Sequence, residues 1–219
     1  GEYTTLTAAE AMPLETAVRL VRFRAQAMQE AVPAGSGGMA AILGLSDEQV
    51  AQACAEAAQG EVVEAVNFNA PSQVVIAGHA AAVGRACEAA KRRGAKRALP
   101  LPVSAPFHCS LLAPAAQRLR ERLRGEPIGS PQVAVINNID VATESEPDRI
   151  RDALARQAAG PVRWAEIIRR MAAEGVTHVV ECGPGRVLAG LTRRIAPDLE
   201  SLALTDPATI DEALARLRG

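Results

Sequence analysis

The first part of the chain carries hydrophobic residues at helical spacing. Leu14, Val18, Val21, Ala25 and Met28 recur every three or four positions, which predicts a helix over residues 13–31 with these side chains as its apolar face. Pro13 suits the first turn of such a helix. The stretch 34–38 (AGSGG) then predicts a flexible connection, because glycine and serine favour loops.

Short apolar runs and two further helical patterns alternate between residues 39 and 102. Ser46 with Gln49 predicts a capping box at the start of one helix, and Gly94 predicts the end of the other. The expected strands are 39–43, 62–68, 73–77 and 98–102, and the expected helices are 46–58 and 79–93. This β-α-β-β-α-β order is typical of a ferredoxin-like subdomain.

The remaining sequence alternates between the same two kinds of pattern. Helices are expected at 111–124, 150–157, 162–173 and 210–217 and after the turn 183–185, with strands at 133–137, 178–181 and 201–204. Strands separated by helices favour a mainly parallel sheet. We therefore expect an α/β fold in which residues 1–34 and 103–219 form a large subdomain and residues 35–102 an inserted small one.

Composition and charge exclude several functional classes. The 219 residues carry a formal net charge of −1, which argues against a general nucleic-acid or membrane-surface binder. Aromatic residues make up only 2%, too few for a base-stacking surface. No apolar run reaches membrane-spanning length, and no signal sequence is visible. The four cysteines form no CxxC pair, so we expect no metal site, and idle thiols fit a cytoplasmic protein.

Two residues are candidates for chemistry by their position. His108 follows a predicted strand and precedes a helix, where it could act as a general base or could simply be a loop histidine. Arg24 could grip a carboxylate with its planar fork, or it could belong to a solvated charged face. The other histidines, His79 and His178, look structural. The turn at 183–190 lacks the spacing of a nucleotide-binding loop, so a tight structural turn is expected there.

Several longer motifs occur together and in one order. They are MQEAVP at 28–33, NFNAPSQVVIAG at 67–78, GAKRALPLPVS at 94–104, PFH at 106–108, PVRW at 161–164 and ECGPG at 181–185. With these motifs the sequence closely resembles the bacterial malonyl-CoA:acyl carrier protein transacylases of type II fatty acid synthesis. The resemblance spans essentially the whole chain and implies an α/β-hydrolase-like acyltransferase core with an inserted ferredoxin-like subdomain.

The resemblance also assigns roles to individual residues. His108 matches the base that activates a serine nucleophile, and the backbone carbonyl of Gln157 matches the group that orients it. Arg24 matches the arginine that binds the malonyl carboxylate, and Phe107 matches the variant whose ring crowds an α-methyl branch. Weaker correspondences place Asn67 and Gln73 at the cleft between the subdomains.

The implied substrates are malonyl-CoA and holo acyl carrier protein, with no metal, no other cofactor and a monomeric intact protein. Acyl carrier protein is acidic, so basic residues are expected to steer it. Arg193, Arg194, Lys96 and Arg97 are the candidates, and ordinary surface charge is the alternative interpretation of these four.

One part of the family pattern is not found in the sequence. In the family, the residues matching Gly1-Glu2-Tyr3 directly follow the Ser-Leu of the nucleophile elbow. We therefore expect the serine upstream of Gly1 in a longer intact protein, and we expect residues 1–219 alone to be inactive. The alternative hypothesis, which the missing serine favours, is a non-catalytic fragment or module that binds acyl carrier protein or an acyl ligand.

Overall fold

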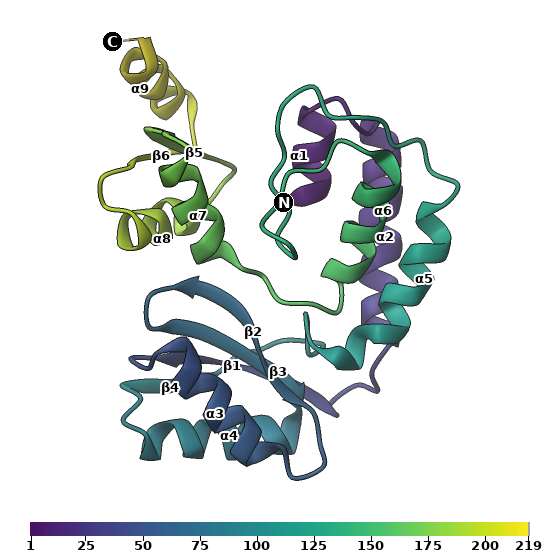
Figure 1. The fold of residues 1–219 in the computed structure, drawn as a ribbon, viewed down its shortest axis with the longest axis vertical. Helices are drawn as coiled ribbons and strands as arrows, with labels where there is room; N and C mark the ends of the chain where they lie inside the picture. Colours follow the sequence, from purple (N-terminus) through teal and green to yellow (C-terminus); the bar gives the residue numbers. More distant parts are fainter. Residues whose placement is uncertain (219) are drawn as a thin grey trace. The chain divides into compact units, whose positions relative to one another are not determined.

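The computed structural model describes residues 1–218 as an α/β chain (Figure 1). The first half contains α1 (Glu2–Ala8), α2 (Leu14–Glu30), β1 (Gly37–Leu43), α3 (Asp47–Ala58), β2 (Val63–Ala70), β3 (Gln73–His79), α4 (Ala80–Arg92) and β4 (Arg97–Pro100). The second half contains the 3-10 turn η1 (Ser110–Leu112), α5 (Ala113–Leu123), α6 (Pro147–Gln157), α7 (Trp164–Ala173), β5 (His178–Cys182), α8 (Val187–Ile195), β6 (Glu200–Leu204) and α9 (Pro207–Arg218).

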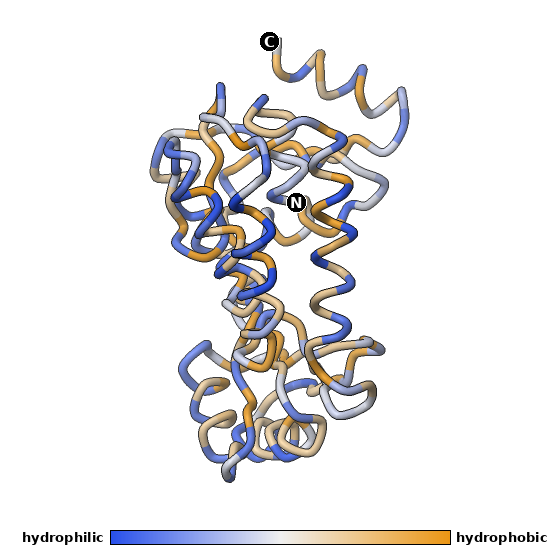
Figure 2. The backbone as a smooth tube through the Cα atoms, turned by 90° about the vertical axis from the view of Figure 1, so that its right-hand side faces the viewer, coloured by the Kyte–Doolittle hydropathy of each residue, from blue (hydrophilic) through white to orange (hydrophobic). Residues whose placement is uncertain are grey.

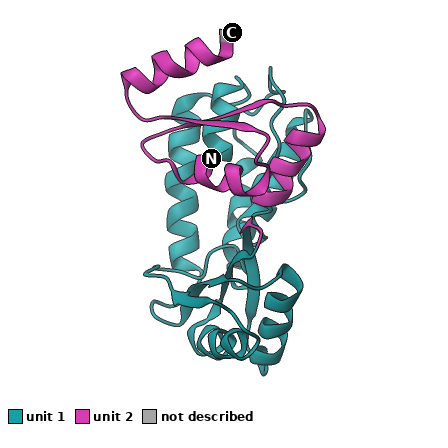
Figure 3. Cartoon of the chain, turned by 90° about the vertical axis from the view of Figure 1, so that its left-hand side faces the viewer, with its two compact units in different colours: residues 1–68, 72–163 teal, residues 69–71, 164–219 magenta. Residues whose placement is uncertain are grey.

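Contacts between residues divide the chain into two compact units (Figure 3). The first unit comprises Gly1–Phe68 and Ser72–Arg163, and the second comprises Asn69–Pro71 and the chain from Trp164 onward. Hydrophobic and hydrophilic residues alternate along the helices (Figure 2). None of the helices in the described part of the chain is long and apolar enough to cross a membrane.

A four-stranded sheet in the first unit has the strand order β2-β3-β1-β4, with β1 antiparallel to both β3 and β4. The predicted β-α-β-β-α-β order of elements is confirmed. Ser46 caps α3 in a full capping box with Gln49, as predicted. Gly94 follows α4 with a φ of 91°, and its amide donates to the Lys91 carbonyl, so it ends the helix as expected.

Strand β3, one of the two inner strands, is apolar from Val74 to Ala77 because both faces of the sheet are covered. Val74 and Ile76 pack with residues of α3 and α4, which cover one face (Figure 1). Val75 and Ala77 point to the other face and pack with Cys109, next to His108. This face of the sheet therefore packs against the loop that carries His108, the candidate base.

A second core of the first unit joins α1, α2, α5 and α6. The predicted helix over 13–31 is present as α2. Of its predicted apolar face only Met28 is buried, and the other four residues are exposed, so most of that face is wrong. Leu14, Val18 and Val21 are 68%, 61% and 48% exposed, whereas Leu20 and Ala27 are fully buried. The helix carries a second apolar stripe at the same spacing, and periodicity alone cannot decide which stripe packs inward.

The expected mainly parallel sheet is wrong for the described residues. Their one parallel pair of strands is β5 with β6, in the second unit. Residues 133–137, predicted as a strand, contribute only an isolated bridge between Ile136 and Thr143. The β-branched residues of this segment favour a strand. Val133 is nevertheless 61% exposed, so the segment is not buried between other strands.

Candidate active site

The loop before η1 holds His108 in a left-handed backbone conformation with a φ of 68°. Such a conformation costs about 1–3 kcal/mol in a residue other than glycine and is frequent at functional sites. Two contacts hold the loop. First, the Pro106 ring packs so closely on Gly37 that a Cβ at that position would lie 2.5 Å from it. Second, the carboxylate of Glu64 in β2 accepts hydrogen bonds from the Ser110 amide at 2.9 Å and from the Ser110 hydroxyl at 2.6 Å.

The His108 ring is joined to the end of α6. Its Nδ1 lies 3.0 Å from the backbone carbonyl oxygen of Gln157. A carbonyl can only accept, so Nδ1 carries the proton in the neutral ring and Nε2 keeps its lone pair. The geometry thus matches the arrangement implied for the two residues by the family resemblance, with Nε2 as the basic atom.

Three influences act on the pKa of His108. Burial lowers it most, the bonds to the backbone carbonyls of Gln157 and Gly160 raise it, and the positive charge of Arg24 lowers it further. The net direction is below the ordinary histidine value. A neutral, proton-accepting ring is therefore retained at neutral pH, as a general base requires.

This direction predicts the pH dependence of turnover. In the full-length protein, kcat/KM is expected to be constant near neutral pH and to fall with an apparent pKa below about 6.5, because protonation of Nε2 removes the base. A pH series of initial rates at low substrate concentration measures this limb. An apparent pKa of 6.5 or above would contradict the buried, neutral ring.

Arg24 lies in the middle of α2, and its Nη2 donates to the side-chain oxygen of Gln157 at 3.0 Å. Its Nε is buried and has no hydrogen-bond partner among the described residues. Burial lowers the pKa of Arg24, partly offset by the nearby Tyr3 and Glu2. A guanidinium that is largely out of water with an unused donor suits a carboxylate ligand.

Gln157 therefore brings the two candidates together, through its carbonyl for His108 and through its side chain for Arg24. No pattern in the sequence indicated the contact between Gln157 and Arg24, which joins residues 133 positions apart. The hydrogen bonds between Glu64 and Ser110 were equally unpredicted. No local pattern predicts either pair, because each is formed only when distant elements pack.

The other residues expected near the substrate lie in the first unit. Phe107 is half-buried. It packs against the core formed by α1, α2, α5 and α6 and also against the cluster on the sheet that contains Cys109. Asn67 on β2 forms an isolated parallel bridge with Val162, and Gln73 begins β3 opposite Leu43. The structure thus places Phe107 beside His108, whereas Asn67 lies within β2 and Gln73 is the first residue of β3.

The four candidate carrier contacts lie in different units. Lys96 and Arg97 are exposed at the start of β4 in the first unit. Arg193 and Arg194 are exposed on α8 in the second unit, where Arg193 donates to the Ser201 carbonyl at 3.0 Å and Arg194 to the Pro71 carbonyl at 3.3 Å. All four remain reachable from solvent in their own units.

The remaining candidates have structural contacts. His79 accepts a bond from the Val62 amide, and His178 pairs with Glu200 at 3.1 Å. At the turn before α8, the carboxylate of Glu181 accepts from the Ala189 amide at 2.8 Å, so this carboxylate already occupies the helix start that a phosphate would use. Within the described residues, no group of three or more His, Cys, Asp or Glu could hold a metal ion.

The comparisons with known proteins first define a class. The family profile described as acyl transferase domain matches residues 1–201. Malonyl CoA-acyl carrier protein transacylase of Escherichia coli K12 is 54% identical over 214 residues, which cover 98% of this chain and 69% of that protein. The chain belongs to the malonyl CoA-acyl carrier protein transacylases, within the acyl transferase domain family.

Solved structures show the same similarity. The acyl-carrier-protein S-malonyltransferase of Burkholderia pseudomallei 1710b is 64% identical with a TM-score of 0.97, covering 98% of this chain and 70% of that one. A malonyl-transacylase in complex with the holo acyl-carrier protein of a type II PKS is 50% identical with a TM-score of 0.97, covering 99% of this chain and 70% of that one. The α/β fold is therefore shared with these enzymes.

Proposed function

We propose that this chain supplies the base and the carboxylate-binding group of an enzyme that transfers a malonyl group from malonyl-CoA to the phosphopantetheine thiol of acyl carrier protein, in fatty acid synthesis. The observation that carries the proposal is Gln157, which joins the ring of His108 and the guanidinium of Arg24. The likeness to malonyl transacylases names the substrates.

In the first half of the reaction, Nε2 of His108 takes the proton from the serine hydroxyl of the acyl-enzyme mechanism. The serine oxygen attacks the thioester carbon, an ester bond forms, and the carbon–sulfur bond to CoA breaks. The protonated His108 then gives its proton to the leaving CoA thiolate. Meanwhile Arg24 holds the free carboxylate of the malonyl group with charge-assisted hydrogen bonds.

In the second half, the same residues act in reverse order. His108 takes the proton of the phosphopantetheine thiol, whose sulfur attacks the ester carbon. The serine oxygen leaves and recovers the proton from His108, which restores the neutral ring. Basic residues at Lys96, Arg97, Arg193 and Arg194 are proposed to attract the acidic carrier, since their side chains are exposed.

The finer structural assignments belong to the same proposal. Residues 35–102 are proposed as a ferredoxin-like subdomain inserted into an α/β-hydrolase-like core formed by 1–34 and 103–219. The strand order β2-β3-β1-β4 and a hydrophobic cluster drawn only from this segment support the insertion. We further propose that the enzyme is cytoplasmic and monomeric and uses no metal or other cofactor. Asn67 and Gln73 are proposed to support the cleft between the two subdomains.

The test of the function is a transfer assay with the full-length gene product. Radiolabelled malonyl-CoA and holo acyl carrier protein are mixed with enzyme, and label on the carrier is measured, with apo acyl carrier protein as control. Label is expected on the holo carrier alone, because only it bears the accepting thiol. Binding of the carrier without transfer of label would instead support the non-catalytic module.

Phe107 provides a separate prediction about substrate choice. Phe107→Ala is expected to raise the rate with methylmalonyl-CoA relative to malonyl-CoA by about tenfold, because removing the ring opens space for one methyl group. Phe23→Ala is a matched control, since this half-buried phenylalanine of α2 lies under Arg118 and Arg122. Unaltered discrimination in Phe107→Ala would contradict a steric role for the ring.

A further inference from the structure

Gln157 is the last residue of α6, where the helix itself does little to hold its carbonyl. The last four carbonyls of an α-helix have no partner within the helix. This freedom allows the Gln157 carbonyl to accept from His108, but it also allows the carbonyl to turn away. The direction of the carbonyl must therefore depend on contacts outside the helical hydrogen bonds.

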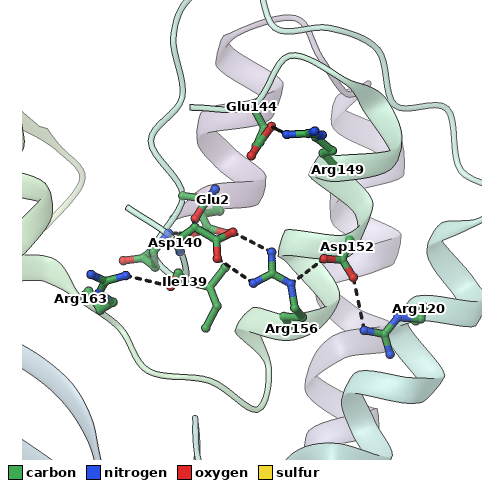
Figure 4. Close-up of polar contacts among 11 residues, drawn as sticks. Glu2, Arg120, Ile139, Asp140, Glu144, Arg149, Asp152, Arg156 and Arg163 are labelled. Carbon is green, nitrogen blue, oxygen red and sulfur yellow. Dashed lines mark hydrogen bonds and ion pairs between the residues drawn. The ribbon is translucent and has the colours of Figure 1, made fainter. Parts of the chain in front are cut away.

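Arg156, the residue before Gln157, binds two carboxylates at once (Figure 4). Its Nη1 and Nη2 donate to the two carboxylate oxygens of Asp140 at 2.8 and 2.6 Å, and its Nε donates to Asp152 at 2.5 Å. Asp152 lies one turn earlier on α6, whereas Asp140 lies in the preceding loop. The planar fork thus ties the last turn of α6 to that loop.

The loop of residues 137–141 is itself held firmly. The side chain of Asn137 accepts from the Asp140 amide at 2.7 Å, and both nitrogens of Asn138 donate to the buried carboxylate of Glu2 in α1. A Cβ on Gly160 would stand 2.3 Å from the Cδ1 of Ile139, so the loop packs closely on the segment after Gln157. Arg156 therefore binds a loop that is itself held by several contacts.

We infer that the ion pair between Arg156 and Asp140 positions Gln157 and, through its carbonyl, the ring of the catalytic base His108. The inference rests on the proposed function of His108. Ion pairs as exposed as this one contribute little to overall stability. We assign the ion pair a positioning role, because Gln157, which follows Arg156, contacts both His108 and Arg24.

The test compares Arg156→Met with Arg149→Met in the full-length protein. Arg149 is a matched control, because it also lies on α6 and pairs with a carboxylate of the preceding loop, Glu144, at 3.7 Å. Arg156→Met is expected to lower kcat/KM by about tenfold to a hundredfold, as a displaced catalytic group does. Arg149→Met is expected to stay near the wild-type rate, and Arg156→Lys to fall between them.

Two readouts separate positioning from a general loss of structure. The carbonyl bond raises the pKa of His108, so its loss in Arg156→Met is expected to move the acid limb of kcat/KM to lower pH. The same shift is expected in the titration of the His108 ring followed by NMR, which needs no turnover. If the wild-type protein does not transfer malonyl groups, the proposed function fails while the ring titration still decides this inference.

An unchanged ring titration and pH profile in Arg156→Met would overturn the inference, as would a loss of rate no larger than that of Arg149→Met. If Arg156→Met does not fold, Asp140→Asn replaces it, because this variant keeps the shape of the side chain but removes its charge and turns one of its two acceptor oxygens into an amide donor. An Asp140→Asn enzyme with wild-type titration of His108 would likewise overturn the role of the ion pair.

Discussion

Replacing His108 by alanine in the full-length protein is expected to reduce malonyl transfer by about 10²–10⁴-fold, the usual contribution of general acid–base catalysis. The ring is the only group we assign to proton transfer, and it acts in both halves of the reaction. Its Nδ1 is occupied by the Gln157 carbonyl, which leaves Nε2 for the substrate. The loss should therefore fall on kcat for both half-reactions.

The measurement is a single-turnover experiment that follows acylation by malonyl-CoA and deacylation by holo acyl carrier protein separately. His178→Ala is the control, since this histidine pairs with Glu200 in the second unit and has no assigned role in catalysis. It should retain nearly full activity. Equal rates for His108→Ala and the wild type in either half-reaction would exclude the ring as base for that step.

Replacing Arg24 by alanine is expected to change which acyl group is transferred. Truncating one partner of a buried, hydrogen-bonded charge pair costs about 2–5 kcal/mol, equivalent to at least about 30-fold in the rate with malonyl-CoA. Acetyl-CoA lacks the carboxylate, so its rate should fall little. Arg24→Lys should lie between wild type and alanine, because lysine keeps the charge without the planar fork.

The ratio of malonyl to acetyl transfer separates two effects of this substitution. Arg24 also contacts the side chain of Gln157, so its removal can displace the base, which would slow both substrates equally. Loss of the carboxylate contact slows malonyl transfer alone. Arg22→Ala is the control, since Arg22 lies exposed on the same helix. An unchanged ratio in Arg24→Ala would remove the carboxylate-binding role.

Local sequence signals predicted most of the fold. The predicted capping box at Ser46 and the predicted glycine end of α4 are both confirmed, because each depends on contacts within a few residues. The prediction failed where packing decides between equal local patterns. On α2, both apolar stripes have helical spacing, and only the cores of the first unit select Leu20 over Val18.

The candidate site shows the same division. The resemblance named His108, Gln157 and Arg24, and the structure brings these three residues into contact. The resemblance did not name the residues that support them. The pairs of Glu64 with Ser110 and of Asp140 with Arg156 join positions 46 and 16 apart in the chain. Such contacts produce no periodic pattern in the sequence, since any acceptor within reach could form them.

The sequence by itself determined most of the succession of helices and strands, with the exception of residues 133–137, and named the residues proposed for acyl transfer. Propensity, spacing and caps act over short windows, so those features are encoded where they occur. Only the tertiary structure decided that one residue, Gln157, contacts both the proposed base His108, through its backbone carbonyl, and the proposed carboxylate-binding Arg24, through its side chain. That choice depends on how α2, α6 and the His108 loop pack, because hydrogen bonds between distant residues form only after the cores have brought them together.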